Sequence, residues 1–83
     1  MNNELKAMRV SLRGKQAWLG PFQHSEVLEN RKREFALFDP QVRILVGPET
    51  LVGDEPVAGV NEALHVLGIS KEEFDAHCAG IHH

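Results

Sequence analysis

Apolar and polar residues alternate along residues 6–12, and this repeat of two is typical of a strand with one buried face. A tight turn at Gly14 follows, because glycine tolerates the positive φ angles that such turns need. Residues 16–20 form a second apolar segment, which stops at Gly20 and Pro21. The pattern therefore predicts a β-hairpin at the start of the chain.

A helix is predicted over residues 26–37, with Ser25 as its N-cap and acidic residues in its first turns, where the helix dipole favours negative charge. An entirely polar stretch at residues 29–34 interrupts the apolar face of this helix. Residues 33–38 are therefore left open between a helix and a short strand. Pro40 ends either element, since the residue before a proline disfavours helix.

Residues 41–46 are rich in β-branched side chains and predict the clearest strand of the chain. Residues 47–56 hold two glycines, two prolines and three acids, which is typical of a loop. Apolar residues then recur at spacings of three and four over residues 57–67, which predicts a helix that Gly68 ends. Ser70 opens a last helix, because a glutamate three residues later completes a capping box.

These elements predict an α+β fold in the order β-β-α-β-α-α. We expect a small single-layer antiparallel or mixed sheet of about three strands, covered on one face by two or three helices. With 83 residues, the chain is expected to form a single domain, residues 1–83. So short a chain buries a modest share of its surface, and a partner or a second copy would add useful buried area.

The single cysteine, Cys78, excludes a scaffold of internal disulfides. The first residues carry no long apolar run of the signal-peptide kind, and the longest apolar run is far shorter than the roughly 20 residues that span a bilayer. We therefore expect a cytoplasmic protein.

The net charge of −3 hides an asymmetry between the two halves of the chain. Residues 1–43 carry a charge of +3, whereas residues 44–83 carry −6. Two interpretations remain open: a charged partner surface, or halves that face each other within the molecule or across a dimer. The second interpretation is the simpler one.

Residues 63–74 resemble the helix-turn-helix signature, in which a helix, a turn of the type Gly68-Ile69-Ser70 and a second helix follow one another. The resemblance implies DNA binding through the second helix. That helix carries three acids against Lys71, and an acidic helix is repelled by phosphate. An ordinary pair of helices joined by a capped turn is therefore the favoured interpretation.

A nucleic-acid-binding regulator is nevertheless the alternative hypothesis, because basic residues cluster in the N-terminal half. If the hairpin and the first helix lie side by side, one patch would form. Trp18 and Phe22 would then offer stacking surfaces to single-stranded bases. The basic candidates are Arg9, Arg13, Lys15, Arg31, Lys32 and Arg33.

Catalysis finds little support in the sequence. Neither a Gly-rich phosphate loop nor a nucleophile elbow is present. His77 and Cys78 are neighbours on a predicted helix and point about 100° apart, so they are not a ready base and nucleophile. Together with His82 and His83 they match no structural zinc pattern. We expect no enzyme, no metal site and no cofactor.

The preferred hypothesis is therefore a small non-enzymatic regulator or adaptor that acts by protein–protein interaction, with a homodimer as an open alternative. Exposed large aromatic residues often carry the binding energy of an interface, and an acidic loop speeds association with a basic partner. The candidate partner-binding residues are Trp18, Phe22, Phe38, Asp54 and Glu55.

Overall fold

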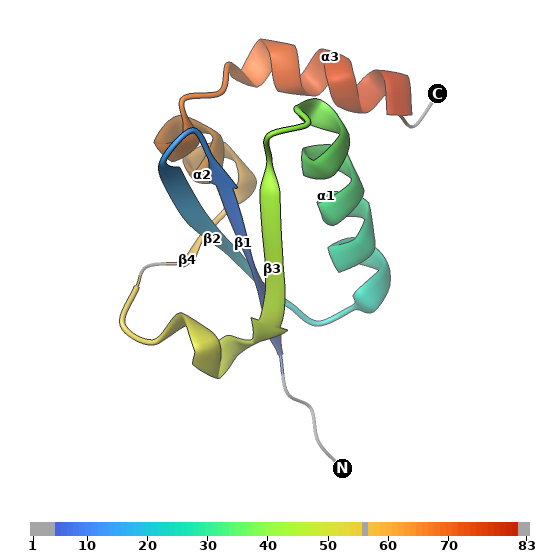
Figure 1. Cartoon of the computed structure of the whole chain (residues 1–83). Helices are drawn as coiled ribbons and strands as arrows, with labels where there is room; N and C mark the ends of the chain where they lie inside the picture. The colour runs from blue at the N-terminus through green and yellow to red at the C-terminus, as the bar shows by residue number, and fades with distance from the viewer. Residues whose placement is uncertain (1–4, 56, 82–83) are drawn as a thin grey trace.

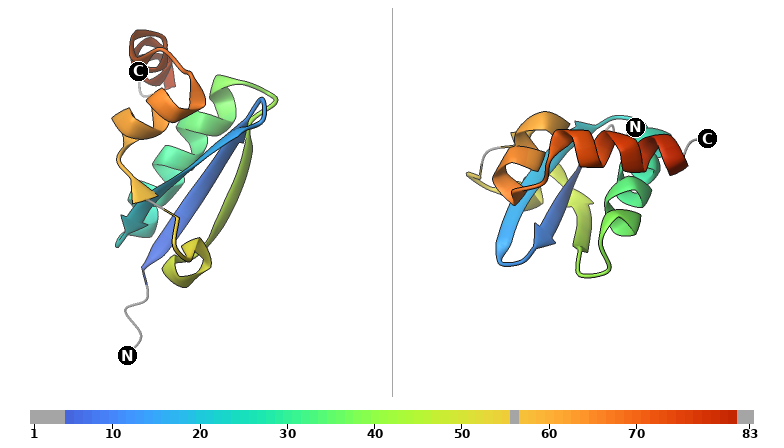
Figure 2. Two further views of the ribbon diagram at one scale, coloured as in Figure 1. Left: turned by 90° about the vertical axis from the view of Figure 1, so that its left-hand side faces the viewer. Right: turned by 90° about the horizontal axis from the view of Figure 1, so that it is seen from above.

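The structure, a computed structural model, describes residues 5–55 and 57–81. Within these ranges the chain forms one four-stranded mixed sheet and three α-helices, and the helices gather on one side of the sheet (Figures 1 and 2). The elements in chain order are β1 (Lys6–Leu12), β2 (Lys15–Phe22), α1 (Ser25–Phe38), β3 (Arg43–Pro48), the short 3-10 helix η1 (Glu49–Val52), β4 (Val57–Ala58), α2 (Val60–Leu67) and α3 (Lys71–Ile81). The predicted order β-β-α-β-α-α is confirmed, with a fourth strand added.

The predicted hairpin is β1 and β2, joined by a turn in which Arg13 has φ 51° and Gly14 φ 82°. Two successive residues with positive φ match the right-handed twist of the flanking strands. The strand order across the sheet is β3-β1-β2-β4. The strand β1 runs antiparallel to both of its neighbours, whereas β4 runs parallel to β2, so the sheet is mixed.

The fourth strand lies where the sequence predicts the start of a helix. Val57 and Ala58 pair with Trp18 and Leu19 of β2, and α2 begins only at Val60. A strand of two residues is too short to show a period in the sequence, so the apolar spacing of the following helix masks it. The end of α2 agrees with the prediction, because Gly68 adopts the left-handed conformation at φ 75°.

The helix α1 extends to Phe38, which assigns residues 33–38 to a helix. The prediction of Ser25 as the N-cap is wrong: Ser25 is the first helical residue, and the N-cap is His24, whose side chain makes no capping bond. The cap of α3 agrees better, since the Glu73 backbone N–H donates to Ser70 Oγ at 3.4 Å. In the polar stretch of α1, Glu34 is buried and accepts a 2.7 Å hydrogen bond from Arg31, and this ion pair replaces the missing apolar contact.

The main core lies between the sheet and the helices. Met8, Val10 and Leu12 of β1 point into it and meet side chains of all three helices. At its centre the rings of Phe35 and Phe74 lie 4.7 Å apart at 38°, which is a favourable tilted arrangement. This contact joins α1 to α3, which also meet through Phe38 and His77.

Replacing Phe35, which is 0% exposed, with alanine should lower the free energy of unfolding by about 3–5 kcal/mol, because the cavity beside Phe74 cannot close. Urea unfolding followed by circular dichroism measures the change. The control is Leu37→Ala, since Leu37 lies two residues away on α1 and is 62% exposed. A loss of similar size in both variants would contradict this account of the core.

Candidate binding surface on the open face of the sheet

The face of the sheet opposite the helices carries one aligned row of side chains, which we call the cross-sheet row. Leu45 of β3 pairs with Arg9 of β1, Arg9 pairs with Trp18 of β2, and Trp18 pairs with Val57 of β4. Directly opposed residues in neighbouring strands share a face, so the four side chains stand next to one another. The open face is therefore organised around this row.

Trp18 is buried in the cross-sheet row, at 5% exposure, although the sequence suggests an exposed anchor. Its ring packs with Ala7 and with Val52 of η1 in a second, small apolar cluster. The indole N–H donates a hydrogen bond to the carboxylate of Glu55. The guanidinium of Arg9 lies 5.8 Å from the centre of the ring, within range of a cation–π contact. Trp18 therefore forms the floor of the open face.

Arg9 itself is only partly satisfied. Its Nε is buried and finds no hydrogen-bond acceptor within residues 5–55 and 57–81. Arg43 stands in the next row, where it pairs with Ser11, and is exposed. The open face thus presents two guanidinium groups, those of Arg9 and Arg43. The nearby carboxylate of Glu55 already accepts a hydrogen bond from the Trp18 indole.

Among residues 5–55 and 57–81, three large apolar side chains are exposed around this face: Leu45 (40%), Leu51 (49%) and Val57 (37%). Leu51 belongs to η1 and lies over Gly47, where the Cβ of any larger residue would come within 2.6 Å of the Leu51 Cδ2 atom, so η1 is seated against the sheet. Leu45 was missed as a candidate, although alternation in the predicted strand 41–46 places it opposite the core-facing Ile44. The alternating pattern of its strand could thus have predicted the exposure of Leu45. No such pattern exists for Val57, because β4 has only two residues.

The five candidate partner-binding residues do not form one surface. Trp18 and Glu55 are bonded to each other, and Asp54 is exposed beside Glu55. Phe22 and Phe38 are partly buried against the main core on the helix side of the sheet. The ring of Phe38 packs at 5.6 Å from Phe74, as an ordinary core residue does. Their roles in partner binding stay predictions.

The six basic candidates are also dispersed. Arg9 lies on the open face, whereas Arg31, Lys32 and Arg33 belong to α1 on the other side of the sheet (Figure 1). Arg31 is paired with Glu34. The structure therefore does not gather the predicted basic patch in one place.

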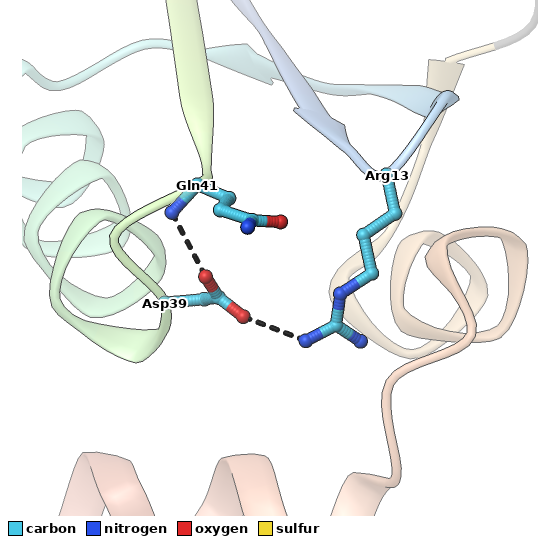
Figure 3. Close-up of polar contacts among 3 residues, drawn as sticks. All are labelled: Arg13, Asp39 and Gln41. Atoms are coloured by element: carbon cyan, nitrogen blue, oxygen red, sulfur yellow. Dashed lines mark hydrogen bonds and ion pairs between the residues drawn. The ribbon is translucent and has the colours of Figure 1, made fainter.

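Arg13 lies in the hairpin turn, and Lys15, the other remaining basic candidate, begins β2 directly after it. Figure 3 shows that Arg13 donates a 2.8 Å hydrogen bond to Asp39, whose other oxygen accepts the backbone N–H of Gln41 at 2.8 Å. This bridge ties the hairpin turn to the link between α1 and β3. Lys15 approaches Gly68 at the C-terminal end of α2, where the helix dipole favours a cation.

A groove of about 490 Å³ between α1, α2 and α3 contains Glu34 and Cys78. Burial raises the pKa of the Cys78 thiol, and the negative charge of Glu34 raises it further. His77 contacts the Glu34 backbone oxygen through Nε2 at 2.9 Å. His82 and His83 lie outside the described residues, and within those residues no three acids, histidines or cysteines gather as metal ligands. The groove thus holds a protonated thiol and a carboxylate already paired with Arg31.

Comparison of the chain with known protein families, with curated proteins and with solved structures gives no match. None of the helices formed by residues 5–55 and 57–81 has the length and apolarity needed to cross a membrane.

Removing the carboxylate that holds the indole should loosen Trp18. Trp18 is the sole tryptophan, so its fluorescence reports on this site alone. In Glu55→Ala we expect a red-shifted emission and a loss of about 1–3 kcal/mol in the free energy of unfolding, since a charge-assisted bond is lost. Asp54→Ala, one residue away, is the control and should leave the emission unchanged. An unshifted spectrum in Glu55→Ala would show that the bond does not hold the ring.

The Cys78 thiol should react slowly with thiol reagents in the folded chain, because its raised pKa leaves little thiolate near pH 8. The folded state favours the protonated thiol of Cys78. The free energy of unfolding should therefore fall as the pH rises above the ordinary pKa of a cysteine thiol. Glu34→Gln removes the adverse charge while Arg31 remains, and should speed labelling at a fixed pH. Equal rates in the folded and urea-unfolded chains would contradict the shift.

Proposed function

We propose that this chain is a non-enzymatic binding module, a regulator or adaptor that docks another protein onto the open face of its sheet. The observation that carries the proposal is the cross-sheet row, in which exposed Leu45 and Val57 flank a fixed floor of Arg9 and Trp18. A sheet covered on one face presents its other face without any rearrangement, and a preformed surface loses little conformational freedom on binding.

The chemistry of the open face favours a partner surface that is apolar with acidic groups at its margin. Leu45, Leu51 and Val57 supply exposed apolar area. The unsatisfied Nε of Arg9 calls for an acceptor, and a partner carboxylate or backbone carbonyl would provide one. Arginine is enriched at protein interfaces because its planar group binds such acceptors and also packs on apolar surface.

The alternative of a nucleic-acid-binding regulator receives less support, because the basic candidates lie on different sides of the sheet and two of them are paired with acids. Trp18, the intended stacking surface, is covered. Binding of DNA or RNA that weakens steeply with salt would favour this alternative.

The test is affinity capture from a native lysate with the wild-type chain and two matched variants. Val57→Glu places a charge in the cross-sheet row, whereas Val66→Glu changes a valine of similar exposure (48% against 37%) on α2 behind the sheet. We expect a protein that wild type and Val66→Glu retain and that Val57→Glu binds about tenfold more weakly, the cost of burying an unpaired charge. Retention of the same proteins by all three chains, or of none by the wild type, would contradict docking on this face.

A further inference from the structure

The outer edge of β3 is an unpaired strand edge. Strand β3 ends the sheet on one side, and no strand formed by the described ranges pairs with its outer edge. The opposite edge is β4, which is only two residues long and so offers little to a further strand. Among the strands formed by the described residues, β3 therefore offers a free edge along its whole length, whereas the outer edge of β2 is interrupted by β4.

The backbone groups that point outward at this edge follow from the pairing of β3 with β1. Glu49 donates its backbone N–H to Leu5 at 2.9 Å, and antiparallel pairs alternate between bonded and non-bonded positions. The backbone N–H and C=O groups therefore point toward β1 at residues 43, 45, 47 and 49. At Ile44 and Val46 the same backbone groups point outward, away from the sheet. Pro48 has no N–H, so it limits the open edge to these two residues.

We propose that a second copy of this chain pairs antiparallel with this edge about a two-fold axis at Leu45, so that two sheets join into one of eight strands. Ile44 then lies opposite Val46 of the second copy, and the two symmetric pairs form four backbone hydrogen bonds. The dimer uses the edge of the sheet and needs no other protein on its open face, so it goes beyond the docking proposed above.

The side chains at the axis suit a second copy. Leu45 meets its own counterpart at a non-hydrogen-bonded position, where the two Cα atoms are about 4.5 Å apart. This contact buries an apolar side chain that is 40% exposed in the single chain. Pairing around any other residue would not bring two copies of this leucine together.

Charge complementarity favours the same register. Arg43 lies opposite Gly47 of the second copy in this register, and Glu49 follows Gly47 by two residues, so the two charges lie diagonally across the axis within reach of long side chains. Both residues are exposed, and neither makes an ion pair within residues 5–55 and 57–81. Each of the three ion pairs found there joins two residues of the same half of the chain. None of them therefore links the basic half, residues 1–43, to the acidic half, residues 44–83. The dimer would pair Arg43, from the basic half of one copy, with Glu49, from the acidic half of the other copy.

The helix layer continues this complementarity. Helix α1 lies in the helix layer on the outer side of β3, away from β1, and runs in the opposite direction (Figures 1 and 2). The two elements are about equally long, at roughly 20 Å each. The two-fold axis therefore passes near the middle of α1 and sets two copies of it antiparallel.

One flank of α1 points away from α2 and α3. Leu28 and Phe35 face the sheet, and Arg31 and Glu34 face the groove toward α2 and α3. At 100° per residue, the opposite flank is made of exposed residues. These are Ser25, Glu29, Lys32 and Ala36. Antiparallel pairing sets Lys32 against Glu29 of the second copy, twice, and the small Ser25 against Ala36.

The test is a charge-reversal cycle on the purified full chain, with the mass measured by light scattering and the dissociation constant by sedimentation. We expect wild type to reach twice the 9.3 kDa of one chain. Arg43→Glu and Glu49→Arg should each weaken the dimer about tenfold, because each sets like charges across the axis twice. The double variant should restore wild-type affinity.

Two matched substitutions separate the edge from the open face. Leu45→Lys should abolish the dimer, whereas Val57→Lys, on the same face but at the far edge, should leave it intact. In the dimer the amides of Ile44 and Val46 should be protected from hydrogen exchange. A wild-type chain that stays monomeric, with these amides exchanging freely, would overturn the proposal, as would a dimer indifferent to both reversals. Docking of another protein is judged separately, by Val57→Glu.

Discussion

The constraint that shapes this molecule is that the helices formed by residues 5–55 and 57–81 cover only one face of its sheet. The main core is complete on that face, where Phe35 and Phe74 join α1 to α3. On the other face the described part of the chain forms no second helix layer, so the ring of Trp18 is stabilised by its immediate neighbours. Trp18 is held by Glu55 from the loop, covered by Arg9 and backed by Val52 of η1. The exposed side chains of Leu45, Leu51 and Val57 lie around the ring of Trp18.

Local signals predict much of the fold, because they act over a few residues. The period of two in β1, the positive φ at Gly14 and the left-handed end of α2 at Gly68 each depend on neighbouring residues alone. What the sequence could not predict depends on distant contacts. Strand β4 exists because β2 offers it an edge, and the buried Glu34 is tolerated because Arg31 pairs with it.

The candidate binding surface was harder to predict than the fold, since exposure of a side chain is decided by the whole molecule. Large aromatic residues suggest interface anchors, but a chain this small needs them for its own packing. Trp18 is buried in the small cluster with Ala7 and Val52, and Phe38 packs against the main core. The basic residues cluster along the chain, yet α1 carries three of them to the opposite side of the sheet from Arg9. Conversely, Leu45 is exposed because its strand is the last of the sheet.

Leu45 belongs both to the cross-sheet row and to the free edge of β3, and this double position links the two proposed surfaces. If two edges pair about Leu45, the two rows meet end to end, because directly opposed residues share a face. The joined row would run from Val57 of one copy through both leucines to Val57 of the other. The four arginines of the two copies, Arg9 and Arg43 from each, would then lie on one continuous face. A protein docking there would meet a symmetric surface about twice as long as a single chain offers, so dimer formation would set the size and symmetry of the partner that fits.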